Sequence, residues 1–581
     1  MNDDQGVVLA ALVALVAGLL SGRASAGTLF GGVALFFVAM GYVAVDAALA
    51  QLVNPGLVAV VLLLLLGAVL DRAQGLERAL GTLLRGPYRW ALLKLMLFSA
   101  ALSAFLNNTA VVAGLIGPLK ASTAQPASRL LMPMCFAASL GGVLTLVGTS
   151  TNLLVNGLWV ARGQPSLAIF DLLPVGLALL GACLLAMLLT MPRLLREDVQ
   201  APERTTDYLL EADLEPGSPL VGRTVQDAGL RRLVHLYLAE IVRDGQVLAP
   251  VEPDERLRAG DTLVFTGDVS RLDLLLRFPG LRPHGTHEGG TVLPGVDRLT
   301  EVVLTADSAL LRRTLRESDF RGRYDAAVVA LRRGGERLSG GLGDIRLAAG
   351  DSLMLVTGPD FETRSASAGD FLVLRQQPVR GFAQRWREVT AISAFLGVIA
   401  LSALGWVPLV KGLLLLLAGF LVLGFARPVD LRRRMPFEII VVIASALVIS
   451  DVLLRTGTAG HLAAALLSVA AGLGPMGALA AVLLLTWLLT ELMSNNAAAA
   501  LMFPVAWGVA QQLGLPPLPF VMAVLYGASC SFLTPYGYQT NLMIMAPGRY
   551  RLSDYVRCGA PVAAAFCATA VFTIPLVFPL R

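Results

Sequence analysis

Two short polar stretches interrupt apolar runs of this chain: Gly148-Thr149-Ser150-Thr151-Asn152 within residues 129–160, and Gly537-Tyr538-Gln539-Thr540-Asn541 within residues 517–546. Their final asparagines are 389 positions apart. Each stretch begins with glycine, ends with a Thr-Asn pair and follows a Leu-Thr pair a few residues upstream. This repetition indicates that one polar break has been duplicated within a long apolar sequence.

A second pair of polar clusters precedes these breaks. Asn107-Asn108-Thr109 lies upstream of the first break and Ser494-Asn495-Asn496 upstream of the second. Asn108 and Asn496 are 388 positions apart, almost the same offset as that of the breaks. The nearly constant offset predicts that the apolar part of the chain consists of two repeats with slightly different loops.

The composition is that of a membrane protein. Of 581 residues, 56% are hydrophobic and 15% are charged, and the mean hydropathy is +0.70. Soluble proteins carry about 25% charged residues, so these values predict a polytopic α-helical protein in a lipid bilayer. The net charge of +5 does not indicate nucleic-acid binding, because most basic residues outside the central block flank apolar runs, where they fix topology.

Charge divides the chain into three parts. Residues 193–385 hold 29 of the 41 acidic residues, so a charged block separates two apolar halves, each with several runs near the roughly 20 residues that a transmembrane helix needs. The predicted domains are a first membrane repeat (1–192), two soluble modules (205–280 and 293–372) and a second membrane repeat (386–581).

Basic residues indicate the orientation of the spans. If each half has five spans and a re-entrant hairpin, and the central block is cytoplasmic, the inside loops carry 14 Lys and Arg residues against four outside: Arg162, Lys411, Arg455 and Arg581. This distribution obeys the positive-inside rule. An odd number of spans in each half makes the two repeats inverted relative to each other.

The central block is itself duplicated, at a shift of 90 residues. Arg223-Thr224 and Gly260-Asp261 recur as Arg313-Thr314 and Gly350-Asp351. Strand-like apolar runs joined by glycine-containing turns predict two small α+β modules. Neither a dinucleotide-binding glycine loop nor a Walker or Gly-x-Ser-x-Gly motif is present, so neither an enzyme nor an ATP-driven pump is indicated.

The polar clusters have the pattern of a transport site. Hydrogen bonds between helices explain most single polar residues within spans, but these clusters recur beside Gly and Pro breaks at matching places, which points to a site near the bilayer midplane. A broken helix exposes N–H groups with about half a positive charge and C=O groups with about half a negative charge. The first group suits an anion and the second a cation.

The side chains of the clusters divide by their chemistry. Amide carbonyls suit a hard cation such as Na⁺, and the predicted cation ligands are Asn108, Asn152, Asn496 and Asn541. Hydroxyl and amide groups can donate to oxyanion oxygens, and the predicted substrate ligands are Asn107, Thr109, Ser150, Thr151, Ser494, Asn495 and Thr540. No Arg or Lys lies within the clusters, so the anion is expected to bind together with its cation.

Glu491 is the ionisable residue closest in sequence to these clusters. It lies four residues before Asn495 at the end of a long apolar run, and at an offset of 388 its counterpart is Ser103. Two roles are open for it. One is a proton or coupling residue, with H⁺ as the alternative coupling ion; the other is a structural acid held by hydrogen bonds.

The four clusters resemble motifs of the divalent anion/sodium symporters, the sodium–sulfate and sodium–dicarboxylate transporters of the wider ion-transporter superfamily. The Ser-Asn-Thr hairpin motif of that family resembles residues 107–109, with Asn for Ser, and residues 494–496, with Asn for Thr. The Gly-Tyr-Gln-Thr-Asn stretch and the following Ala546-Pro547-Gly548-Arg549-Tyr550 are similar to the sulfate-type branch. The central modules resemble TrkA-C (RCK-C) modules of potassium-channel and potassium-uptake regulators, which bacterial members of the family carry as insertions.

The resemblance implies a fold, an assembly and an activity. Each inverted repeat would contain a re-entrant hairpin and a broken helix, and a homodimer would move its transport domains by an elevator motion. The activity would be Na⁺-coupled symport of a small divalent anion, with a sulfate-like inorganic oxyanion ranked above a dicarboxylate. The location would be a bacterial-type inner membrane, and a small molecule or nucleotide is the candidate regulator of the cytoplasmic modules.

Two other functions stay open at this point. A Na⁺/H⁺ antiporter or an arsenite-type efflux protein of the same superfamily would need a titratable group in its site, which would be Glu491. A ligand-gated channel or a sensor would instead use the paired modules for gating or ligand detection. A purely structural role for the modules has the same standing as regulation by a ligand.

Overall fold

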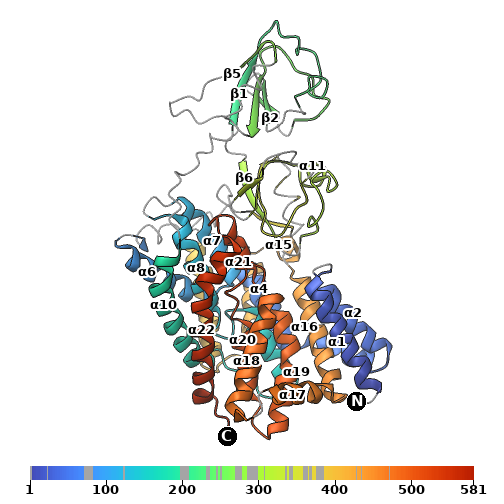
Figure 1. Cartoon of the computed structure of the whole chain (residues 1–581), viewed down its shortest axis with the longest axis vertical. Coiled ribbons are helices and arrows are strands. Elements are labelled where there is room, and N and C mark those ends of the chain that lie inside the picture. The colour runs from blue at the N-terminus through green and yellow to red at the C-terminus, as the bar shows by residue number, and fades with distance from the viewer. Residues whose placement is uncertain are drawn as a thin grey trace. The chain divides into compact units, whose positions relative to one another are not determined.

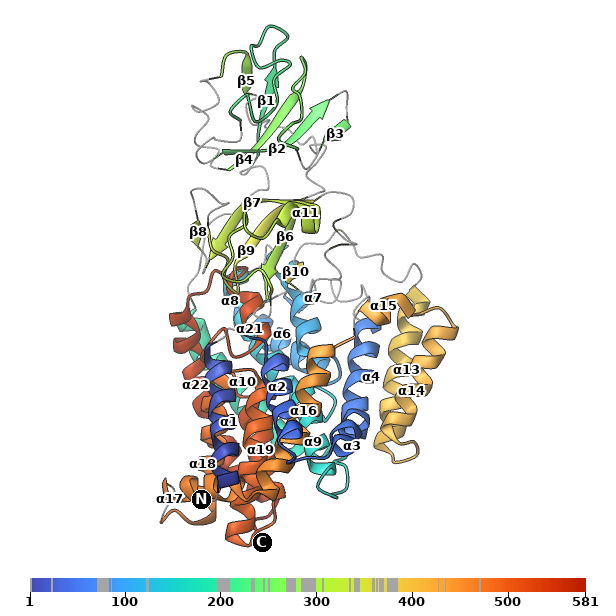
Figure 2. The ribbon, with the colours of Figure 1, turned by 90° about the vertical axis from the view of Figure 1, so that its right-hand side faces the viewer.

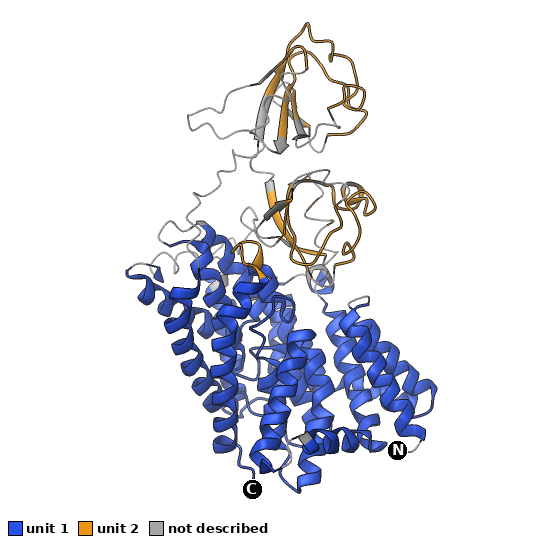
Figure 3. Ribbon diagram, in the orientation of Figure 1, with its two compact units in different colours: residues 1–196, 380–544, 552–581 blue, residues 197–379, 545–551 orange. Residues whose placement is uncertain are grey.

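The computed structural model forms two compact units (Figure 3). The first contains residues 1–196, 380–544 and 552–581 and is helical, whereas the second contains residues 197–379 and 545–551 and carries the described strands. The structure describes residues 3–21, 24–70, 83–84, 86–121, 125–195, 209–230, 236–243, 246–248, 251–267, 278–283, 299–305, 308–333, 336–338, 345–357, 361, 364, 370–373, 385–426, 428–433, 435–469 and 472–581.

The first half of the helical unit contains α1 (Asp3–Ser21), α2 (Ala26–Ala39), α3 (Val45–Ala50), the 3₁₀ turn η1 (Gln51–Val53), α4 (Pro55–Leu70), α6 (Tyr88–Ser103), α7 (Asn108–Ala121), α8 (Ala127–Gly142), α9 (Ser150–Val160) and α10 (Leu173–Leu194) (Figure 1). Prolines occupy the N-cap of α6 and of α8, Pro87 and Pro126. A proline is tolerated there because the first N–H groups of a helix have no partner within it.

The second half contains α13 (Arg385–Ala403), α14 (Leu409–Val422), α15 (Pro428–Arg433), α16 (Phe437–Arg455), α17 (Thr458–Val469), α18 (Gly474–Leu492), α19 (Asn495–Leu513), α20 (Leu518–Ala528), α21 (Gln539–Met545) and α22 (Leu552–Val577). In the described part of the chain, six helical segments are long and apolar enough to cross a membrane: Asp3–Ser21, Val45–Gly67, Leu173–Leu194, Phe437–Arg455, Gly474–Leu492 and Leu552–Val577. These segments agree with the predicted polytopic helical membrane protein.

Helices of the two halves pack across each other. α2 of the first half packs on α16 of the second, α14 of the second packs on α4 of the first, and α10 packs along α22. Figure 2 shows α13 and α14 beside α4. The two halves therefore form one helical unit rather than two separate bundles.

α8 and α20 form the core of this unit. Every residue from Leu130 to Gly142 and from Pro519 to Ala528 is buried. A helix that is apolar on all sides is stable only where other helices surround it. Both core helices end at a polar break, so each break begins at a buried helix end.

The apolar runs 129–160 and 517–546 are each divided into two helices. The chain is not helical between α8 and α9 or between α20 and α21. Glycine is required in both breaks because a Cβ atom on Gly148 would lie 2.6 Å from the carbonyl oxygen of Gly142, and one on Gly537 would lie 2.7 Å from that of Thr490. Close backbone approach therefore fixes the shape of each break.

The second unit contains two five-stranded antiparallel sheets of the same topology. One sheet has the order β3-β2-β4-β1-β5 and the other β10-β6-β9-β7-β8. The first consists of β1 (Leu209–Leu214), β2 (Leu236–Arg243), β3 (Gln246–Leu248), β4 (Thr262–Gly267) and β5 (Leu281–Pro283), and the second of β6 (Leu299–Leu304), β7 (Ala326–Arg333), β8 (Glu336–Leu338), β9 (Ser352–Thr357) and β10 (Phe371–Val373).

The register of pairing repeats as well. β2 shifts register against β4 between Leu238 and Glu240, and β7 shifts against β9 between Val328 and Ala330. A short helix, α11 (Phe320–Tyr324), accompanies the strands in the described part of this unit.

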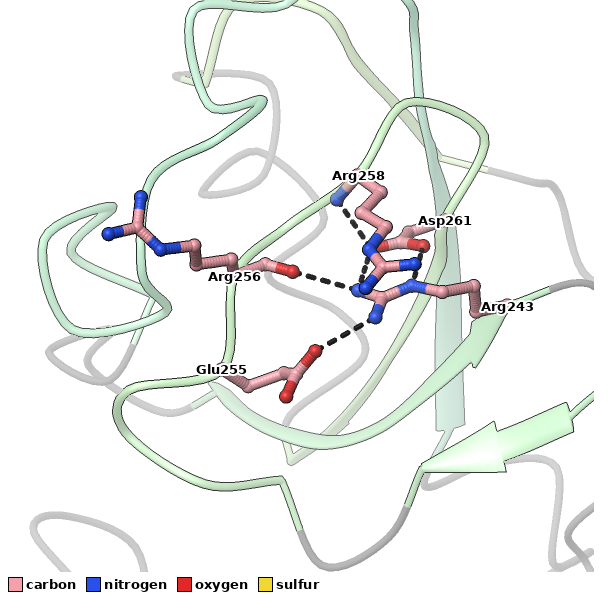
Figure 4. A network of polar contacts seen from close by, with 5 residues as sticks. All are labelled: Arg243, Glu255, Arg256, Arg258 and Asp261. Carbon is pink, nitrogen blue, oxygen red and sulfur yellow. Dashed lines mark hydrogen bonds and ion pairs between the residues drawn. The ribbon is translucent and has the colours of Figure 1, made fainter.

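An ion pair between an arginine and a buried aspartate recurs in the two sheets. Nε and Nη2 of Arg243 donate to the carboxylate of Asp261 at 2.8 and 2.9 Å, and Nη1 donates to Glu255 at 2.8 Å (Figure 4). These hydrogen bonds, above all those to Asp261, raise the pKa of Arg243. Arg333 and Asp351 repeat the pair at 2.7 and 2.8 Å in the second sheet.

Candidate binding site in the helical unit

The first polar cluster forms the tip of a hairpin between α6 and α7. Asn107 is exposed, and its Oδ1 accepts the N–H of Thr109 at 3.0 Å, which satisfies a donor at the start of α7. Asn108 is 3% exposed, and its Oδ1 accepts the hydroxyl of Ser103 at 2.5 Å. Thr109 is half-buried. The tip therefore has one exposed, one buried and one half-buried polar side chain.

The second cluster forms an equivalent tip between α18 and α19. Ser494 is exposed and caps α19, accepting the N–H of Ala497 at 3.4 Å. Asn495 is 7% exposed, and its Oδ1 accepts the hydroxyls of Thr490 and Ser531, each at 2.8 Å. Asn496 is half-buried. The order of exposed, buried and half-buried side chains matches that of the first tip.

These matching contacts correct the predicted register of the tips. Ser103 binds Asn108 five residues later, and Thr490 binds Asn495 five residues later. The tips therefore align at an offset of 387, and the offset of 388 that pairs Asn108 with Asn496 is wrong by one residue. Asn108 corresponds to Asn495 because each is the buried asparagine of its tip.

The same correction applies to Glu491. The hydroxyl of Thr145 donates to the backbone oxygen of Ala104, and the hydroxyl of Thr534 donates to the backbone oxygen of Glu491 at 3.0 Å. Glu491 therefore corresponds to Ala104 and not to Ser103 as predicted. One repeat has a carboxylate at this position and the other has a methyl group.

The asparagine that ends each polar break is held in the same way. Nδ2 donates to the backbone carbonyls ten and seven residues upstream, at 2.9 and 2.9 Å for Asn152 and at 2.8 and 3.2 Å for Asn541. We call these arrangements the first amide cage (Asn152 with the carbonyls of Gly142 and Thr145) and the second amide cage (Asn541 with the carbonyls of Ser531 and Thr534). The preceding residues, Thr151 and Thr540, are 2% and 0% exposed.

Each hairpin tip contacts the polar break of the other repeat. Asn496 Oδ1 accepts the hydroxyl of Thr151 at 3.0 Å and that of Ser150 at 3.4 Å. In the opposite direction, Asn108 Nδ2 donates to the hydroxyl of Tyr538 at 2.7 Å. The structure therefore brings together side chains that lie more than 340 positions apart in the sequence. Asn107 and Ser494 differ from these residues. Their side-chain hydrogen bonds described above are to backbone N–H groups at the start of α7 and of α19.

The two amide cages differ at the side-chain oxygen. Asn152 Oδ1 is buried and has no hydrogen-bond partner among the described residues. Asn541 Oδ1 accepts only a weak donor, Sγ of Cys135, at 3.4 Å. An unsatisfied buried acceptor costs about 1–3 kcal/mol, which a bound cation would offset. The side-chain oxygen of Asn152 thus has the capacity to coordinate a cation.

A small pocket lies next to the first break. Its volume is about 20 Å³, the space that one ordered water needs. Its lining includes Asn107, Thr149 and Ser150 together with Val60, Leu63, Leu64 and Gly67 of α4 and Phe395.

Glu491 is held by backbone donors of the second break. Oε1 accepts the N–H groups of Phe532 and Leu533, and Oε2 accepts that of Thr534, each at 2.9 Å. The side chain is 7% exposed. Three N–H donors stabilise the ionised form of a carboxyl group, so this geometry favours the structural role over that of a proton carrier.

Several residues of the site escaped the sequence prediction. Tyr538 lies in the stretch Gly537–Asn541, but its contact with Asn108 depends on how the two halves of the chain fold together. Thr490 and Ser531 bind Asn495, and Cys135 approaches Asn541. A small hydroxyl residue five positions before the buried asparagine of each tip is the one signal that could have identified Ser103 and Thr490.

Apart from the carboxylate of Glu491, the chemistry of the site is that of neutral dipoles. The hydrogen bonds described here come from amides, hydroxyls and backbone groups, and none comes from Lys or Arg. In the described part of the chain, no group of three or more His, Cys, Asp or Glu side chains is placed to hold a metal ion. Amide and backbone oxygens can coordinate a hard cation, and hydroxyl and N–H groups can donate to an anion.

Comparison with known proteins gives a family and several relatives. A profile described as citrate transporter (CitMHS) matches residues 7–525. A protein of Chlamydomonas reinhardtii, "Putative sulfur deprivation response regulator", is 34% identical over 91% of this chain and 94% of its own length. "Uncharacterized transporter YfbS" of Escherichia coli is 29% identical over the full length of both chains. "Sodium/sulfate cotransporter 1" of Chlamydomonas reinhardtii is 28% identical over 61% of this chain and 41% of its own length.

Proposed function

The chain belongs to the citrate transporter family, and on that premise we propose that it is a secondary active transporter that couples uptake of a small divalent anion to Na⁺. Membership confirms the family-level prediction and identifies a multi-pass transport protein rather than an enzyme. Sodium coupling is supported by relatives in Chlamydomonas reinhardtii, "Sodium/sulfate cotransporter 1", "Sodium/sulfate cotransporter 2" and "Probable sodium/sulfate cotransporter 3". It is also supported by the amide and backbone oxygens of the site, which suit a hard cation.

One observation carries the proposal: the hairpin tip of the second repeat is hydrogen-bonded to the polar break of the first, beside a buried amide oxygen that has no partner in the described structure. In this proposal Asn152 and Asn541 are the central cation ligands, aided by Asn108 and Asn496. The hydroxyls of Ser150, Thr151 and Thr540 and the amides and hydroxyls of Asn107, Thr109, Ser494 and Asn495 face the anion at some stage of transport.

The architecture proposed for this activity is two inverted repeats, 1–192 and 386–581, each with a re-entrant hairpin and a broken helix. The paired tips and breaks, and the exchange of helices between the halves, support it. A homodimer with an elevator motion, a bacterial-type inner membrane, and cytoplasmic regulatory modules at 205–280 and 293–372 complete the proposal. The matched topology of the two sheets supports a duplicated module.

A sulfate-like oxyanion is the first choice of substrate and a dicarboxylate the second. No Arg or Lys joins the polar contacts of the site, so nothing there matches a carboxylate by bidentate pairing. A compact oxyanion needs only short donors, such as hydroxyl and N–H groups.

The test is uptake of radiolabelled sulfate into proteoliposomes with an inward gradient of NaCl or of choline chloride. We expect saturable uptake that requires Na⁺, and equal uptake in choline would contradict sodium coupling. A thermal-shift screen of the purified protein against sulfate, phosphate, dicarboxylates and citrate, with and without Na⁺, identifies the anion, because a ligand of the native state raises its melting temperature.

The geometry of Glu491 weighs against the antiporter or arsenite-efflux alternative. A proton carrier must lose its proton to one side and regain it from the other, whereas this carboxylate is bound by three backbone donors. In an antiporter the titratable group would be indispensable, so full transport activity in Glu491→Gln would count against this alternative, and complete loss of activity would favour it. A gated channel is distinguished by ionic current that does not saturate at millimolar anion.

A further inference from the structure

Glu491 distinguishes two otherwise similar amide cages. The breaks share their glycine, their Thr-Asn pair and the pattern by which Nδ2 of the asparagine is held. Beside the second break the chain has Glu491, and at the equivalent position beside the first it has Ala104. The difference is a buried negative charge, which must have a role because burying a carboxylate is unfavourable without strong partners.

One peptide group connects Glu491 to Asn541. The N–H of Phe532 donates to Glu491 Oε1 at 2.9 Å. The carbonyl of Ser531 belongs to the same planar peptide group and accepts Nδ2 of Asn541 at 2.8 Å. Hydrogen bonds in series polarise one another, so the carboxylate strengthens the hold of the turn on Asn541.

Two further contacts fix the same turn. The N–H groups of Leu533 and Thr534 also donate to the carboxylate, each at 2.9 Å. The carbonyl of Thr534 is the second acceptor of Asn541 Nδ2, at 3.2 Å. Glu491 therefore binds one side of the turn 531–534 through N–H groups, and Asn541 binds the other side through carbonyl groups.

The first cage lacks this support. Val143 is the equivalent of Phe532, and its N–H donates to the carbonyl of Leu140 at 3.4 Å, at the end of α8. The Gly142 carbonyl that holds Asn152 is in the same peptide group as this N–H. Ala104 has no side chain that could accept the N–H of Val143. The Gly142 carbonyl is therefore not polarised by a carboxylate in the way that the Ser531 carbonyl is.

We propose that Glu491 is a positioning residue for Asn541, which makes the second amide cage a stronger Na⁺ site than the first. The proposal rests on the proposed function, because it assumes that both cages bind the coupling cation. The ionised carboxylate orders the turn, and its charge increases the negative potential at Asn541 Oδ1. A cation there needs only to displace the weak hydrogen bond from Cys135.

The experiment compares Glu491→Gln with the wild-type protein. The glutamine Oε1 can still accept the N–H groups of Phe532 and Leu533, but its NH₂ group meets the N–H of Thr534, donor against donor. We measure the NaCl concentration that gives half-maximal thermal stabilisation of the purified full chain, with choline chloride keeping ionic strength constant. We expect this concentration to rise about tenfold, as the loss of one charge-assisted hydrogen bond implies.

Double variants separate positioning from general destabilisation. Combined with Asn541→Ala, the Glu491→Gln change should have no additional effect on Na⁺ dependence, because Glu491 acts through Asn541. Combined with Asn152→Ala, the two effects should multiply. Glu438→Gln is the matched control, since Glu438 accepts a backbone N–H from Gly27 at 3.3 Å in the contact of α2 with α16 and touches neither cage. It should leave Na⁺ dependence unchanged.

The outcomes distinguish this proposal from the proposed function. If Na⁺ does not stabilise the wild-type protein, sodium coupling itself fails. If Na⁺ stabilises the wild-type protein and Glu491→Gln equally, or if Glu491→Gln and Asn541→Ala multiply, the positioning role is overturned. If Glu491→Gln does not fold, Glu491→Asp replaces it, and an unchanged Na⁺ dependence in that variant overturns the proposal in the same way.

Discussion

Asn152 combines two properties that rarely occur together in a folded protein. Its Nδ2 is fully committed to the carbonyls of Gly142 and Thr145, whereas its Oδ1 is buried without a partner among the described residues. The two hydrogen bonds of Nδ2 fix the direction in which Oδ1 points. Because the large majority of buried side-chain polar atoms are paired, this oxygen is the first cation ligand to test within the proposed function.

We therefore expect Asn152→Ala to lower Na⁺-dependent sulfate uptake at least tenfold, since it removes a cation ligand and two structural hydrogen bonds. Asn156→Ala is the control. That amide lies one turn later on α9 and accepts the N–H of Leu167 at 2.9 Å, away from the cage. Its loss should reduce thermal stability but keep the dependence on Na⁺. Equal Na⁺ dependence in the two variants would contradict the role of Asn152.

The sequence predicted which polar residues matter, but not how they pair. Both tips contain two adjacent amide or hydroxyl residues around an asparagine, so a slip of one position still aligns Asn with Asn. The pattern alone cannot separate the offsets 387 and 388. Burial does, because Asn108 and Asn495 are the buried asparagines of their tips, whereas Asn107 is exposed and Asn496 half-buried. The partners of Asn152 and Asn541 are backbone carbonyls. Every residue type has one, so the sequence could not identify these partners.

α10 and α22 contact the two breaks through glycine, and this contact is equivalent but not equally tight in the two repeats. A Cβ on Gly559 of α22 would lie 2.1 Å from the carbonyl oxygen of Phe532, and one on Gly176 of α10 would lie 2.8 Å from that of Val143. Both acceptors belong to the turns next to the amide cages. α10 and α22 therefore pack directly against the turns next to the amide cages.

Gly559→Ala should destabilise the protein by about 1–3 kcal/mol, the range for overpacking of a well-packed core. Gly176→Ala should cost less because its methyl group meets a more distant atom. Gly32→Ala is the control, since nothing lies within 4 Å of a Cβ there. Thermal unfolding of the three variants measures the order. A Gly559→Ala protein as stable as the Gly32→Ala protein would show that α22 can shift away from the break.

The arginine–aspartate ion pairs of the two sheets also differ from each other. Arg243, which binds Asp261 and Glu255, has a side chain that is 13% exposed, whereas the side chain of Arg333, which binds Asp351, is 43% exposed. Arg243→Ala leaves Asp261, a buried carboxylate, without its cation, and breaking such a pair costs about 3–5 kcal/mol. Hydrogen exchange of β2 and β4 in the full chain should accelerate more in Arg243→Ala than exchange of β7 and β9 does in Arg333→Ala. The reverse order would contradict this reading of the network.

The chain combines a helical transport unit with a unit of two matched sheets, and the site residues discussed above all belong to the first. The division into charged and apolar parts could be read from composition because lipid and water demand opposite surfaces. The exchange of helices between the halves could not be read in this way. α2 with α16 and α14 with α4 pair through apolar faces that differ little from faces toward lipid.

Removal of residues 205–372 should therefore leave substrate affinity intact. The contacts that join the two halves, Asn496 with Thr151 and Asn108 with Tyr538, lie within the helical unit and do not depend on the deleted residues. We expect half-saturating concentrations of Na⁺ and sulfate within about twofold of those of the full chain, because affinity follows from contacts in the site. The maximal rate is free to change if the modules regulate transport, and an unchanged maximal rate would favour a structural role for them. A rise of more than tenfold in half-saturating Na⁺, in a variant that still inserts and melts cooperatively, would show that the modules help to shape the site.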